Sequence, residues 1–418
     1  FSNKGNCADR LWPVMMTMNI LHPSWMLLSV CGTLISGKLD PIPSVTVSCE
    51  DTEPGHYLCG KAIGAHFSER IKRAFAIDDM LQALVNKVRE TIHGRASFEQ
   101  LKSHAAKRYP FYMAELNGTA SGAGVDFETL LVANFRMELS TSDPAWTAAF
   151  QGSDACTDLL LADSSRGAIG WAHNEDYPRF FFDALYFVKQ THVDRAGQEI
   201  HSLSSFAYPG ILPGWAPGWN SHGIGLSWNV LYPSQMRPGP GVAVAFVCRD
   251  VLTARNIEEA IRLATPSDLA LGQNLNVGSF HTKRMVTVET APGGAKNSLS
   301  IVDGAPVTFH ANEYLRMTHV PQIQKFLTSS KHRKTTFEHL QGKGLHSMDD
   351  LLYVLGDTSD AAWPIFRRDD TSHEDTLFSI AFNLAAQTVS LYRDNPRIGL
   401  DARQWVVQFN TSSLVTLV

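Results

Sequence analysis

The thiol of Cys156 and the carboxylates of Glu175 and Asp176 flank a segment with the pattern of a β-hairpin. Apolar stretches at 159–162 and 168–172 enclose the turn-forming run Asp-Ser-Ser-Arg-Gly. If the turn lies at the centre of this run, antiparallel pairing places the thiol opposite one of the two carboxylates. The spacing therefore predicts a cysteine nucleophile beside a carboxylate at the open end of a hairpin.

The position of Cys156 at the head of a strand suggests a chain that cuts itself between Ala155 and Cys156. The freed α-amine would have an unperturbed pKa of about 7.7 to 8.0, so near neutral pH it could accept the thiol proton without a separate histidine. The nucleophile would then carry its own base. The alternative is that Cys156 is a small buried apolar residue, as most free cysteines are.

Several further motifs follow the hairpin along the chain. Together with Ala-Cys-Thr-Asp at 155–158 and Gly-Trp-Ala-His-Asn-Glu-Asp at 170–176, they resemble motifs of the acyl-coenzyme A:6-aminopenicillanic acid acyltransferase family of cysteine-type N-terminal nucleophile hydrolases, in the same order. The resemblance covers the chain from about residue 50 to residue 400. The further motifs are Tyr-Pro-Gly-Ile-Leu-Pro-Gly (208–214), Asn-Ser-His-Gly-Ile-Gly-Leu-Ser-Trp-Asn (220–229), Phe-His-Ala-Asn-Glu-Tyr-Leu (309–315), Trp-Pro-Ile-Phe-Arg (363–367) and Tyr-Arg-Asp-Asn-Pro (392–396).

The resemblance implies catalytic roles for five side chains. Cys156 is the cleavage point and the nucleophile that accepts the acyl group. Asp176 orients the α-amine and stabilises its protonated form by charge pairing. Asn229 and Asn312 hold the substrate or supply oxyanion donors, and one such amide can contribute about 3 kcal/mol. Arg367 orders the cysteine and the aspartate.

One residue departs from the family pattern. The family usually has glycine before the cysteine, whereas this chain has Ala155. The methyl group of alanine restricts the strained backbone that an N-to-S acyl shift needs. Cleavage at Ala155-Cys156 is therefore expected to be slower than in the family.

Aromatic and polar residues near the motifs are candidates for binding the substrate. Tyr208, Trp215 and Trp228 could stack on a flat catechol or imidazole, although tryptophans are more often core residues. The first of them lies in a run that resembles the β-alanyl-amine hydrolases of the family, which favours release of dopamine or histamine from a β-alanyl conjugate. Glu175 is a candidate counter-ion for the β-alanyl amine, and His310 is a further candidate contact. Transfer of the acyl group to another amine remains an alternative.

Other interpretations of these residues also remain open. Cys156, His310 and Asn312 form a set like the thiol site of papain-type proteases. Arg368 takes the place of Arg367 if the register shifts by one residue. A non-catalytic relative would keep the fold as a module that binds small amides.

The elements that must position these residues fall into three segments. Residues 1–45 are an unassigned leader, either a secretory signal or an artefact of the gene model. Residues 46–155 are expected to be the helical pro-segment, which becomes the small chain after cleavage, with helical spacing from Pro54 to Thr141 and a glycine-rich break at 118–124. Residues 156–418 form the catalytic region. Helices between antiparallel strands indicate the α+β class, and the resemblance implies a four-layer αββα sandwich.

Short strands and helices alternate in the catalytic region. A hairpin is expected from Ser300–Val302 and Val307–His310 around the turn Asp303-Gly304. The remaining expected elements are helices at 256–264, 322–327 and 347–355 and strands at 378–382, 388–392 and 405–409.

The composition excludes several classes of protein. The chain has 418 residues, of which 44% are hydrophobic and 18% charged, so it can bury a large core and is not disordered. The formal net charge is only -5, and the basic run at 331–334 is expected at a solvated helix end, so no nucleic-acid partner is predicted. The expected partners are a small N-acyl amine and the cleaved small chain, with a dimer of processed chains possible. No cofactor and no membrane association are expected.

The cysteines give little information about the compartment. Their positions include no spacing typical of zinc ligands, so no metal is expected. Cys49 can pair with Cys59, but the low cysteine content fits a reducing compartment equally well. The expected location is cytoplasmic, or secreted if the apolar stretch within residues 1–45 is a signal.

Overall fold

Two β-sheets form the centre of the protein in a computed structural model that describes residues 41–142, 155–237, 239, 241–368, 374–398, 403–410 and 413–415. The expected leader lies outside these residues except at its end. The first sheet has the strand order β1 (Ser44–Glu50), β4 (Tyr186–Val193), β5 (Glu199–Ala207), β6 (Gly218–Asn220), β7 (Ile224–Val230), β8 (Gln273–Ser279), β9 (Met285–Thr290) and β10 (Lys296–Ile301). The second has the order β11 (Thr308–His310), β2 (Ala155–Asp163), β3 (Ala168–Pro178), β12 (Glu374–Asn383), β13 (Thr388–Tyr392), β14 (Arg403–Asn410) and β15 (Ser413–Val415).

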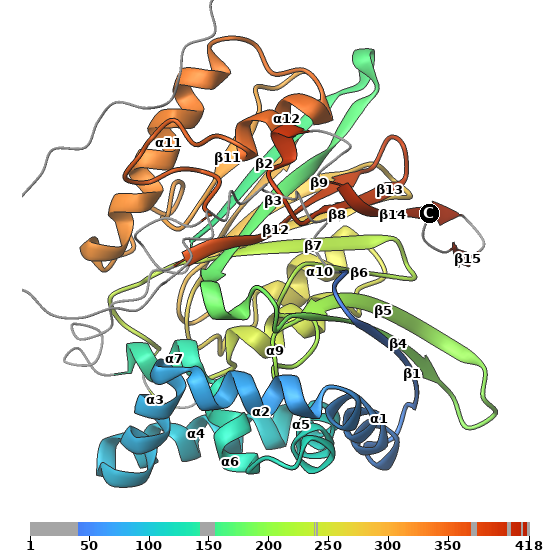
Figure 1. The fold of residues 1–418 in the computed structure, drawn as a ribbon, viewed down its shortest axis with the longest axis vertical. Helices are drawn as coiled ribbons and strands as arrows, with labels where there is room; N and C mark the ends of the chain where they lie inside the picture. The colour runs from blue at the N-terminus through green and yellow to red at the C-terminus, as the bar shows by residue number, and fades with distance from the viewer. Residues whose placement is uncertain are drawn as a thin grey trace, which may run out of the picture. The chain divides into compact units, whose positions relative to one another are not determined.

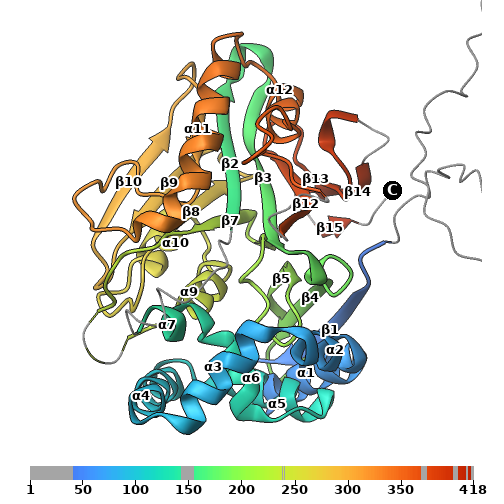
Figure 2. The same cartoon turned by 60° about the vertical axis from the view of Figure 1, so that its left-hand side comes forward.

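Helices cover the outer faces of both sheets (Figures 1 and 2). On the second sheet these are α11 (Leu327–Gln341) and α12 (Met348–Leu355), and α12 packs on β3. The helices over the first sheet are α1 (Glu53–His66), α2 (Ser68–Ile77), α3 (Asp79–Glu90), α4 (Ile92–Arg108), α5 (Pro110–Ala123), α6 (Phe127–Asn134), α7 (Arg136–Thr141), α9 (Val244–Val251) and α10 (Ile257–Ala264). The fold is an α+β sandwich with the layer order α-β-β-α, as expected.

The facing sheets enclose the main core. Every residue of β7 and β8 is buried, because one face of each strand meets the other sheet and the opposite face meets helices. The Trp171 indole of β3 stacks on Phe382 of β12 at a ring distance of 4.2 Å, and its Nε1 donates to Ser227 Oγ of β7 at 3.0 Å. The second sheet, which carries Cys156, is thus held directly against the first.

The helical segment contributes a strand that the sequence pattern did not predict. The helices expected between Pro54 and Thr141 are present as α1–α7. In front of them, β1 pairs in parallel with β4 at the edge of the first sheet, and a disulfide between Cys49 and Cys59 ties β1 to α1. The segment therefore shares a sheet with the catalytic region. Among the described residues, no helix is long and apolar enough to cross a membrane.

The expected glycine-rich break at 118–124 is wrong over most of its length. Helix α5 continues to Ala123 and ends only at Gly124, which adopts the left-handed conformation with φ of 68°. A Cβ atom on Gly118 would lie 2.0 Å from the carbonyl oxygen of Tyr57, and one on Gly60 would lie 1.9 Å from the carbonyl oxygen of Glu115. The glycines therefore allow α1 and α5 to pack backbone to backbone.

Substitution Gly118→Ala is expected to destabilise the protein. Alanine gains up to about 1 kcal/mol in helix propensity. The clash is with a backbone oxygen that cannot rotate away, so overpacking costs about 1–3 kcal/mol or more and dominates. Thermal unfolding should show a lower midpoint. Gly342→Ala is the matched control, because its nearest non-bonded neighbour would be 3.5 Å away, and an equal change in both variants would contradict the packing argument.

The hairpin expected at 300–310 is also wrong. β10 pairs with β9 in the first sheet, whereas β11 pairs with β2 in the second. Asp303 and Gly304 do form the expected turn, but Gly304 N donates to Ala162 O at 2.9 Å, so the turn carries the chain from one sheet to the other. Of the remaining elements, the strands at 378–382, 388–392 and 405–409 and the helices at 256–264 and 347–355 are confirmed, and 322–327 contains a 3-10 turn before α11.

Glu138 is a buried carboxyl group outside the expected site. Its Oε1 accepts the N–H of Val244 at 2.9 Å, whereas its Oε2 has no partner among the described residues. Burial raises the pKa of Glu138 to about 7. The folded state therefore binds the proton more tightly than the unfolded state, and this contribution to stability is lost as the pH rises through 7.

Substitution Glu138→Gln is expected to stabilise the protein at pH 8. At pH 8 the ionised carboxylate lowers the free energy of unfolding by about 3 kcal/mol relative to pH 4, because its pKa in the folded state is raised from an ordinary value near 4.5. Glutamine keeps an acceptor for Val244 and carries no charge. Denaturant unfolding at pH 5 and pH 8 should show a smaller loss of stability with pH in the variant, and parallel pH curves for the two proteins would contradict this.

Candidate active site

The β2–β3 hairpin has the register that the sequence predicts. Cys156 pairs with Glu175 and Ala155 pairs with Asp176. The turn is a 3-10 helix at Ser164–Arg166 that ends on Gly167, whose φ of 66° suits glycine. The thiol and two carboxylates thus meet at the open end of the hairpin.

The backbone of Cys156 is held on both sides. Its N–H donates to Asn312 Oδ1 at 3.1 Å, and its carbonyl oxygen accepts from Arg333 Nη1 at 2.6 Å. The side chain is buried, and Sγ lies within 4.8 Å of a ring nitrogen of His173 and a carboxylate oxygen of Glu175. Burial, followed by the negative charge of Glu175, raises the pKa of the Cys156 thiol to about 12. The thiol is therefore protonated in the uncut chain.

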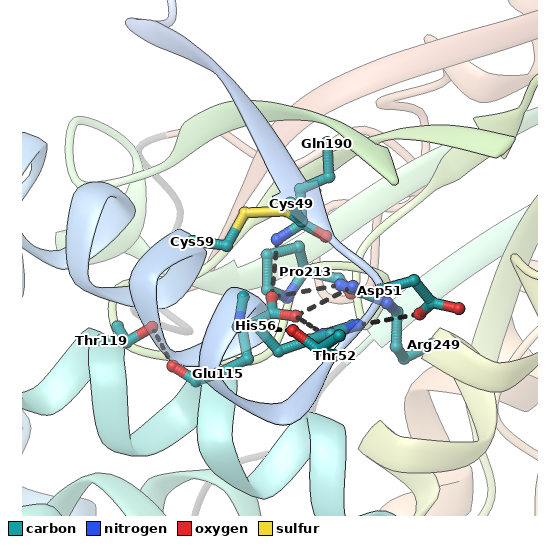
Figure 3. The surroundings of a disulfide bond; sticks show 11 residues. Cys49, Asp51, Thr52, His56, Cys59, Glu115, Thr119, Gln190, Pro213 and Arg249 are labelled. Carbon is teal, nitrogen blue, oxygen red and sulfur yellow. Dashed lines mark hydrogen bonds and ion pairs between the residues drawn. A yellow bond between two sulfur atoms is a disulfide. The ribbon is translucent and has the colours of Figure 1, made fainter. Parts of the chain in front are cut away.

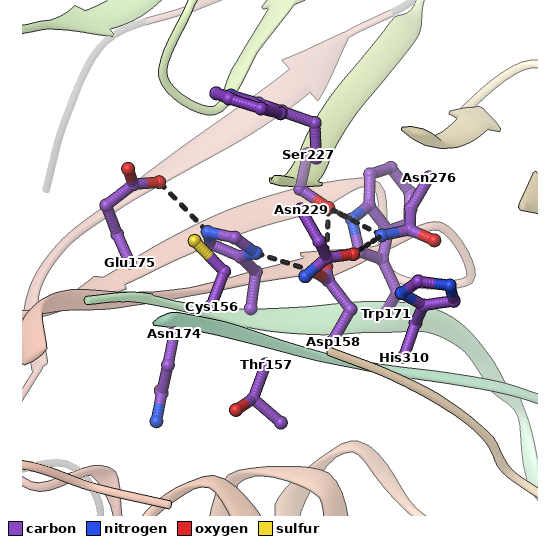
Figure 4. Close-up of polar contacts among 12 residues, drawn as sticks. Cys156, Thr157, Asp158, Trp171, Asn174, Glu175, Ser227, Asn229, Asn276 and His310 are labelled. Carbon is purple, nitrogen blue, oxygen red and sulfur yellow. Dashed lines mark hydrogen bonds and ion pairs between the residues drawn. The ribbon is translucent and has the colours of Figure 1, made fainter. Parts of the chain in front are cut away.

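The histidine beside the thiol lies between two carboxylates. His173 Nδ1 is 2.8 Å from Asp158 Oδ2, and Nε2 is 2.9 Å from Glu175 Oε2. Burial lowers the pKa of His173, but the carboxylates, Asp158 foremost, leave it well above its ordinary value. An imidazolium group therefore lies beside the thiol. Figure 4 shows Cys156 together with the two carboxylates, Glu175 and Asp158.

Asn229 contacts this group through Asp158. Its Nδ2 donates to Asp158 Oδ2 at 2.7 Å, and its Oδ1 accepts from Asn274 Nδ2 at 2.9 Å. Ser227 Oγ donates to the other oxygen of Asp158 at 2.5 Å. One of the two hydrogens on Asn229 Nδ2 thus bonds to Asp158, and the second hydrogen remains to donate to another group.

Asn312 and Arg333 hold the peptide expected to be cut. Arg333 Nη2 donates to Asn312 Oδ1 at 2.7 Å, while Asn312 Nδ2 donates to Val230 O at 3.1 Å. Arg333 is fully buried, and it also donates to Thr157 Oγ1 at 2.7 Å. The expectation that 331–334 is a solvated helix end is therefore wrong for Arg333, because it lies on the inner face of α11.

Asp176 is buried opposite Ala155 with one oxygen unused. Oδ1 accepts from Thr376 Oγ1 at 2.6 Å, and Oδ2 has no hydrogen-bond partner among the described residues. Burial raises the pKa of Asp176 to about 6, while Arg367 and Arg333 hold it below the value that burial alone would give. Asp176 is therefore largely ionised at neutral pH.

Arg367, and not its neighbour, lies next to Asp176. Arg367 Nε is 4.0 Å from Asp176 Oδ2, and the guanidinium group also donates to Glu374 and to Ser329 Oγ. Arg368 instead donates to two backbone carbonyl oxygens, those of Thr376 and Arg393. Arg367, and not Arg368, is therefore the arginine beside Asp176.

Three candidate substrate residues form one aromatic group that contacts Glu175. The Tyr208 hydroxyl donates to Glu175, the Tyr208 and Trp215 rings are 5.4 Å apart, and the Trp215 and Trp228 rings are 5.5 Å apart. The rings are almost fully buried in this uncut chain. Glu175 is thus shared between Tyr208 and His173.

His310 is not part of this group. Its Nε2 is 3.0 Å from Glu289 Oε1 and its Nδ1 is 2.7 Å from Ala311 O, so both ring nitrogens are engaged away from the thiol. The papain-like set of Cys156, His310 and Asn312 is therefore not formed, and His173 is the histidine next to the thiol. Figure 4 shows His310 apart from Cys156.

Comparison with known proteins now decides the family. The sequence profile of the acyl-coenzyme A:6-aminopenicillanic acid acyl-transferase family matches residues 165–398, which is more than half of the chain. The chain belongs to this family. It is a cysteine N-terminal nucleophile enzyme of the amidohydrolase and acyltransferase class.

The chain is also similar to individual proteins. The β-alanyl-dopamine/carcinine hydrolase of Drosophila melanogaster is 24% identical over 361 residues, which cover 82% of this chain and 92% of the fly protein. The 40 kDa form of acyl-coenzyme A:6-aminopenicillanic-acid-acyltransferase from Emericella nidulans is 25% identical over 346 residues, covering 80% and 90% of the two chains. The N-acylethanolamine-hydrolyzing acid amidase ortholog of Caenorhabditis elegans is 16% identical, with a TM-score of 0.38, and covers 55% of this chain and 93% of its own.

Two parts of this candidate site were missed by the sequence prediction. The first is the Asp158–His173 pair, although His173 stands in the hairpin motif itself. The second is Arg333, which the basic run concealed. A signal for Arg333 exists in the helical spacing of α11, since Ser330, Arg333 and Phe337 are all buried and lie on one face.

Proposed function

We propose that the chain is a self-processing amidohydrolase that cleaves small N-acyl amines through a thioester on Cys156. The proposal is carried by buried Asp176, which pairs with Ala155 and whose Oδ2 has no hydrogen-bond partner among the described residues. On the other side of the expected cut, the Cys156 N–H already donates to Asn312. Cleavage would turn this N–H into an α-ammonium group. A carboxylate and an amide oxygen would then accept its hydrogens.

The cleavage step needs no other protein. Cys156 Sγ attacks the carbonyl carbon of Ala155, the C–N bond breaks, and the thiol proton passes to the departing nitrogen. Water then hydrolyses the thioester, which frees the thiol and leaves a carboxylate on Ala155. The high pKa of the buried thiol slows the attack, and the imidazolium of His173 reduces that cost by stabilising the thiolate.

The same thiol then acts on the substrate. The α-amine takes the thiol proton, sulfur attacks the amide carbon, and a tetrahedral oxyanion forms. The second hydrogens on Asn229 Nδ2 and Asn312 Nδ2 are the candidate donors to this oxyanion. The α-ammonium group returns its proton to the leaving amine, and water releases the acid from the thioester.

We favour an N-β-alanyl aromatic amine as the substrate. The rings of Tyr208, Trp215 and Trp228 suit a catechol or imidazole. Asp158 and Glu175 outweigh the charge of His173 by one negative charge, which would attract the ammonium group of a β-alanyl moiety. The fly relative is named for two β-alanyl amines.

N-terminal sequencing and intact mass of the purified wild type test this function first. Two fragments are expected, the larger beginning Cys-Thr-Asp-Leu. The processed enzyme should hydrolyse β-alanyl-dopamine and β-alanyl-histamine faster than N-acetyl-dopamine, which lacks the ammonium group. An uncut chain without turnover would instead support the binding module, and faster acylation of an added amine than release of free acid would support the acyltransferase.

The disulfide bears on the compartment. Cys49 and Cys59 are bonded, and disulfides persist mainly in oxidising compartments. We therefore favour the secreted alternative over the cytoplasmic one. Alkylation of the denatured protein with and without reductant, followed by peptide mass analysis, should show Cys49 and Cys59 modified only after reduction.

A further inference from the structure

A second cluster of titratable side chains lies far from the thiol in sequence and joins three elements. Asp51 follows β1, His56 lies in the first turns of α1, and His192 lies on β4. One ligand-type atom from each lies within 4.8 Å of the others. His56 Nε2 is 3.4 Å from Asp51 Oδ1, and the two imidazole rings are 5.0 Å apart. Figure 3 shows Asp51 and His56 beside the disulfide.

His192 is the unusual member of this cluster. It is 2% exposed, yet neither of its ring nitrogens has a hydrogen-bond partner among the described residues. A buried imidazole without partners costs free energy that folding must offset. Both ring nitrogens are therefore available as ligand atoms for a metal ion.

His56 has the support that metal-binding histidines usually have. Its Nδ1 is 3.4 Å from Glu115 Oε2, on the side of the ring away from Asp51. Glu115 is in turn held by Gln190 Nε2 at 2.6 Å and by Arg249 Nη2 at 3.0 Å (Figure 3). A carboxylate on one ring nitrogen fixes the tautomer and leaves the other nitrogen free to bind a metal.

We propose that Asp51, His56 and His192 bind a divalent transition-metal ion of the zinc class. Two imidazoles and one carboxylate are a donor set that suits zinc, with water in the fourth position. The side chain of Asp51 is 42% exposed and can rotate toward the histidines. No sequence motif indicates this site, because its ligands are spread over residues 51, 56 and 192.

The site would connect the helical segment to the catalytic region. Asp51 and His56 precede the Ala155-Cys156 bond, whereas His192 follows it. In a chain cut as proposed above, the metal would hold the small chain on the large one, and this consequence rests on the proposed function. The Cys49–Cys59 disulfide lies within the small chain and cannot do so.

Titration with Co²⁺ tests the site itself, without requiring cleavage. The full chain is treated with EDTA, kept free of thiol reductants, and titrated as wild type and as Cys156→Ala. The Cys156→Ala variant is needed because Cys156, His173 and Glu175 also lie within 4.8 Å of one another. One Co²⁺ per chain is expected in both proteins, with a visible spectrum typical of four ligands and displacement by Zn²⁺. Loss of binding in Cys156→Ala would overturn the proposal.

Two variants locate the ion. His192→Gln and Asp51→Asn should each weaken Zn²⁺ binding by at least about 10- to 100-fold, the size of effect seen even for outer-shell partners of metal sites. The exposed position of Asp51 makes its variant the safer one for folding, which circular dichroism checks. His339→Gln, at an exposed histidine of α11, is the control and should bind as wild type. Unchanged affinity in Asp51→Asn and His192→Gln would show that the ion binds elsewhere.

Discussion

Cys156→Ala should yield a single uncut chain with no amidase activity. The substitution removes the sulfur that attacks Ala155 and the same sulfur that accepts the acyl group, so both reactions lose their nucleophile. Loss of a catalytic nucleophile typically lowers kcat by a factor on the order of 10⁶. Intact mass reports cleavage, and release of the amine from a β-alanyl amide reports turnover.

Two further variants make this result specific. Cys248→Ala removes the other free cysteine of the described residues, which is buried with Sγ 3.4 Å from Gln273 Oε1, and should leave both reactions intact. Cys156→Ser keeps a weaker nucleophile and should cut slowly. Cleavage before residue 156 in Cys156→Ala would show that another protease makes the cut, and residual turnover there would place the nucleophile elsewhere.

The rate of self-cleavage should also depend on pH and on the residue before the cysteine. Because the pKa of the Cys156 thiol is about 12, the thiolate fraction increases about tenfold per pH unit across the neutral range. Ala155→Gly relaxes the backbone at the cut and should speed cleavage at every pH. A pH-independent rate, measured as uncut chain against time, would contradict attack by the thiolate.

The sequence was most informative where structure depends on near neighbours. The register of Cys156 against Glu175 follows from two apolar stretches around one turn, and the whole pattern is contained in about twenty residues. The prediction of a hairpin at 300–310 was wrong for the opposite reason. Its turn signal was correct, but the partners of β10 and β11 are strands distant in sequence, and a local pattern cannot choose between them.

The sequence also could not predict which charged side chains are buried. Arg333 stands in a basic run, and such runs usually face water. Here three acceptors from distant segments, Cys156 O, Thr157 Oγ1 and Asn312 Oδ1, compensate its desolvation. His192 shows the same limit, since only the fold reveals that its nitrogens are buried and have no hydrogen-bond partner in the part of the chain that the structure describes.

Asp176→Asn should separate activity from stability. In the processed enzyme, the carboxylate stabilises the α-ammonium group, so its loss should lower kcat/KM by a factor on the order of 10² to 10⁴, in the range found for general-base and orienting carboxylates. The pKa of Asp176 is about 6, because burial raises it. The α-ammonium group of the processed enzyme would lower this value, so activity of the wild type should fall at a pH below 6, and this acid limb should be absent from the variant.

The Asp176→Asn variant should be more stable than the wild type, although it is less active. The folded-state pKa lies above the ordinary value of 3.8, so the ionised form opposes folding, and its cost is fully present at pH 8. A difference of about two units corresponds to about 3 kcal/mol. Asp176→Asn, which keeps an acceptor for Thr376 and carries no charge, should therefore unfold at a higher denaturant concentration than the wild type at pH 8.

Thr376→Val provides the matched comparison. It removes the hydroxyl that donates to Asp176 Oδ1 but keeps the charge, and this hydrogen bond lowers the pKa of Asp176. The acid limb should shift to higher pH while activity at pH 8 stays close to that of the wild type. A variant Asp176→Asn that is both inactive and less stable would mean that the carboxylate serves folding. An inactive and more stable Asp176→Asn variant would mean that the buried carboxylate destabilises the fold and is needed by the α-amine for activity.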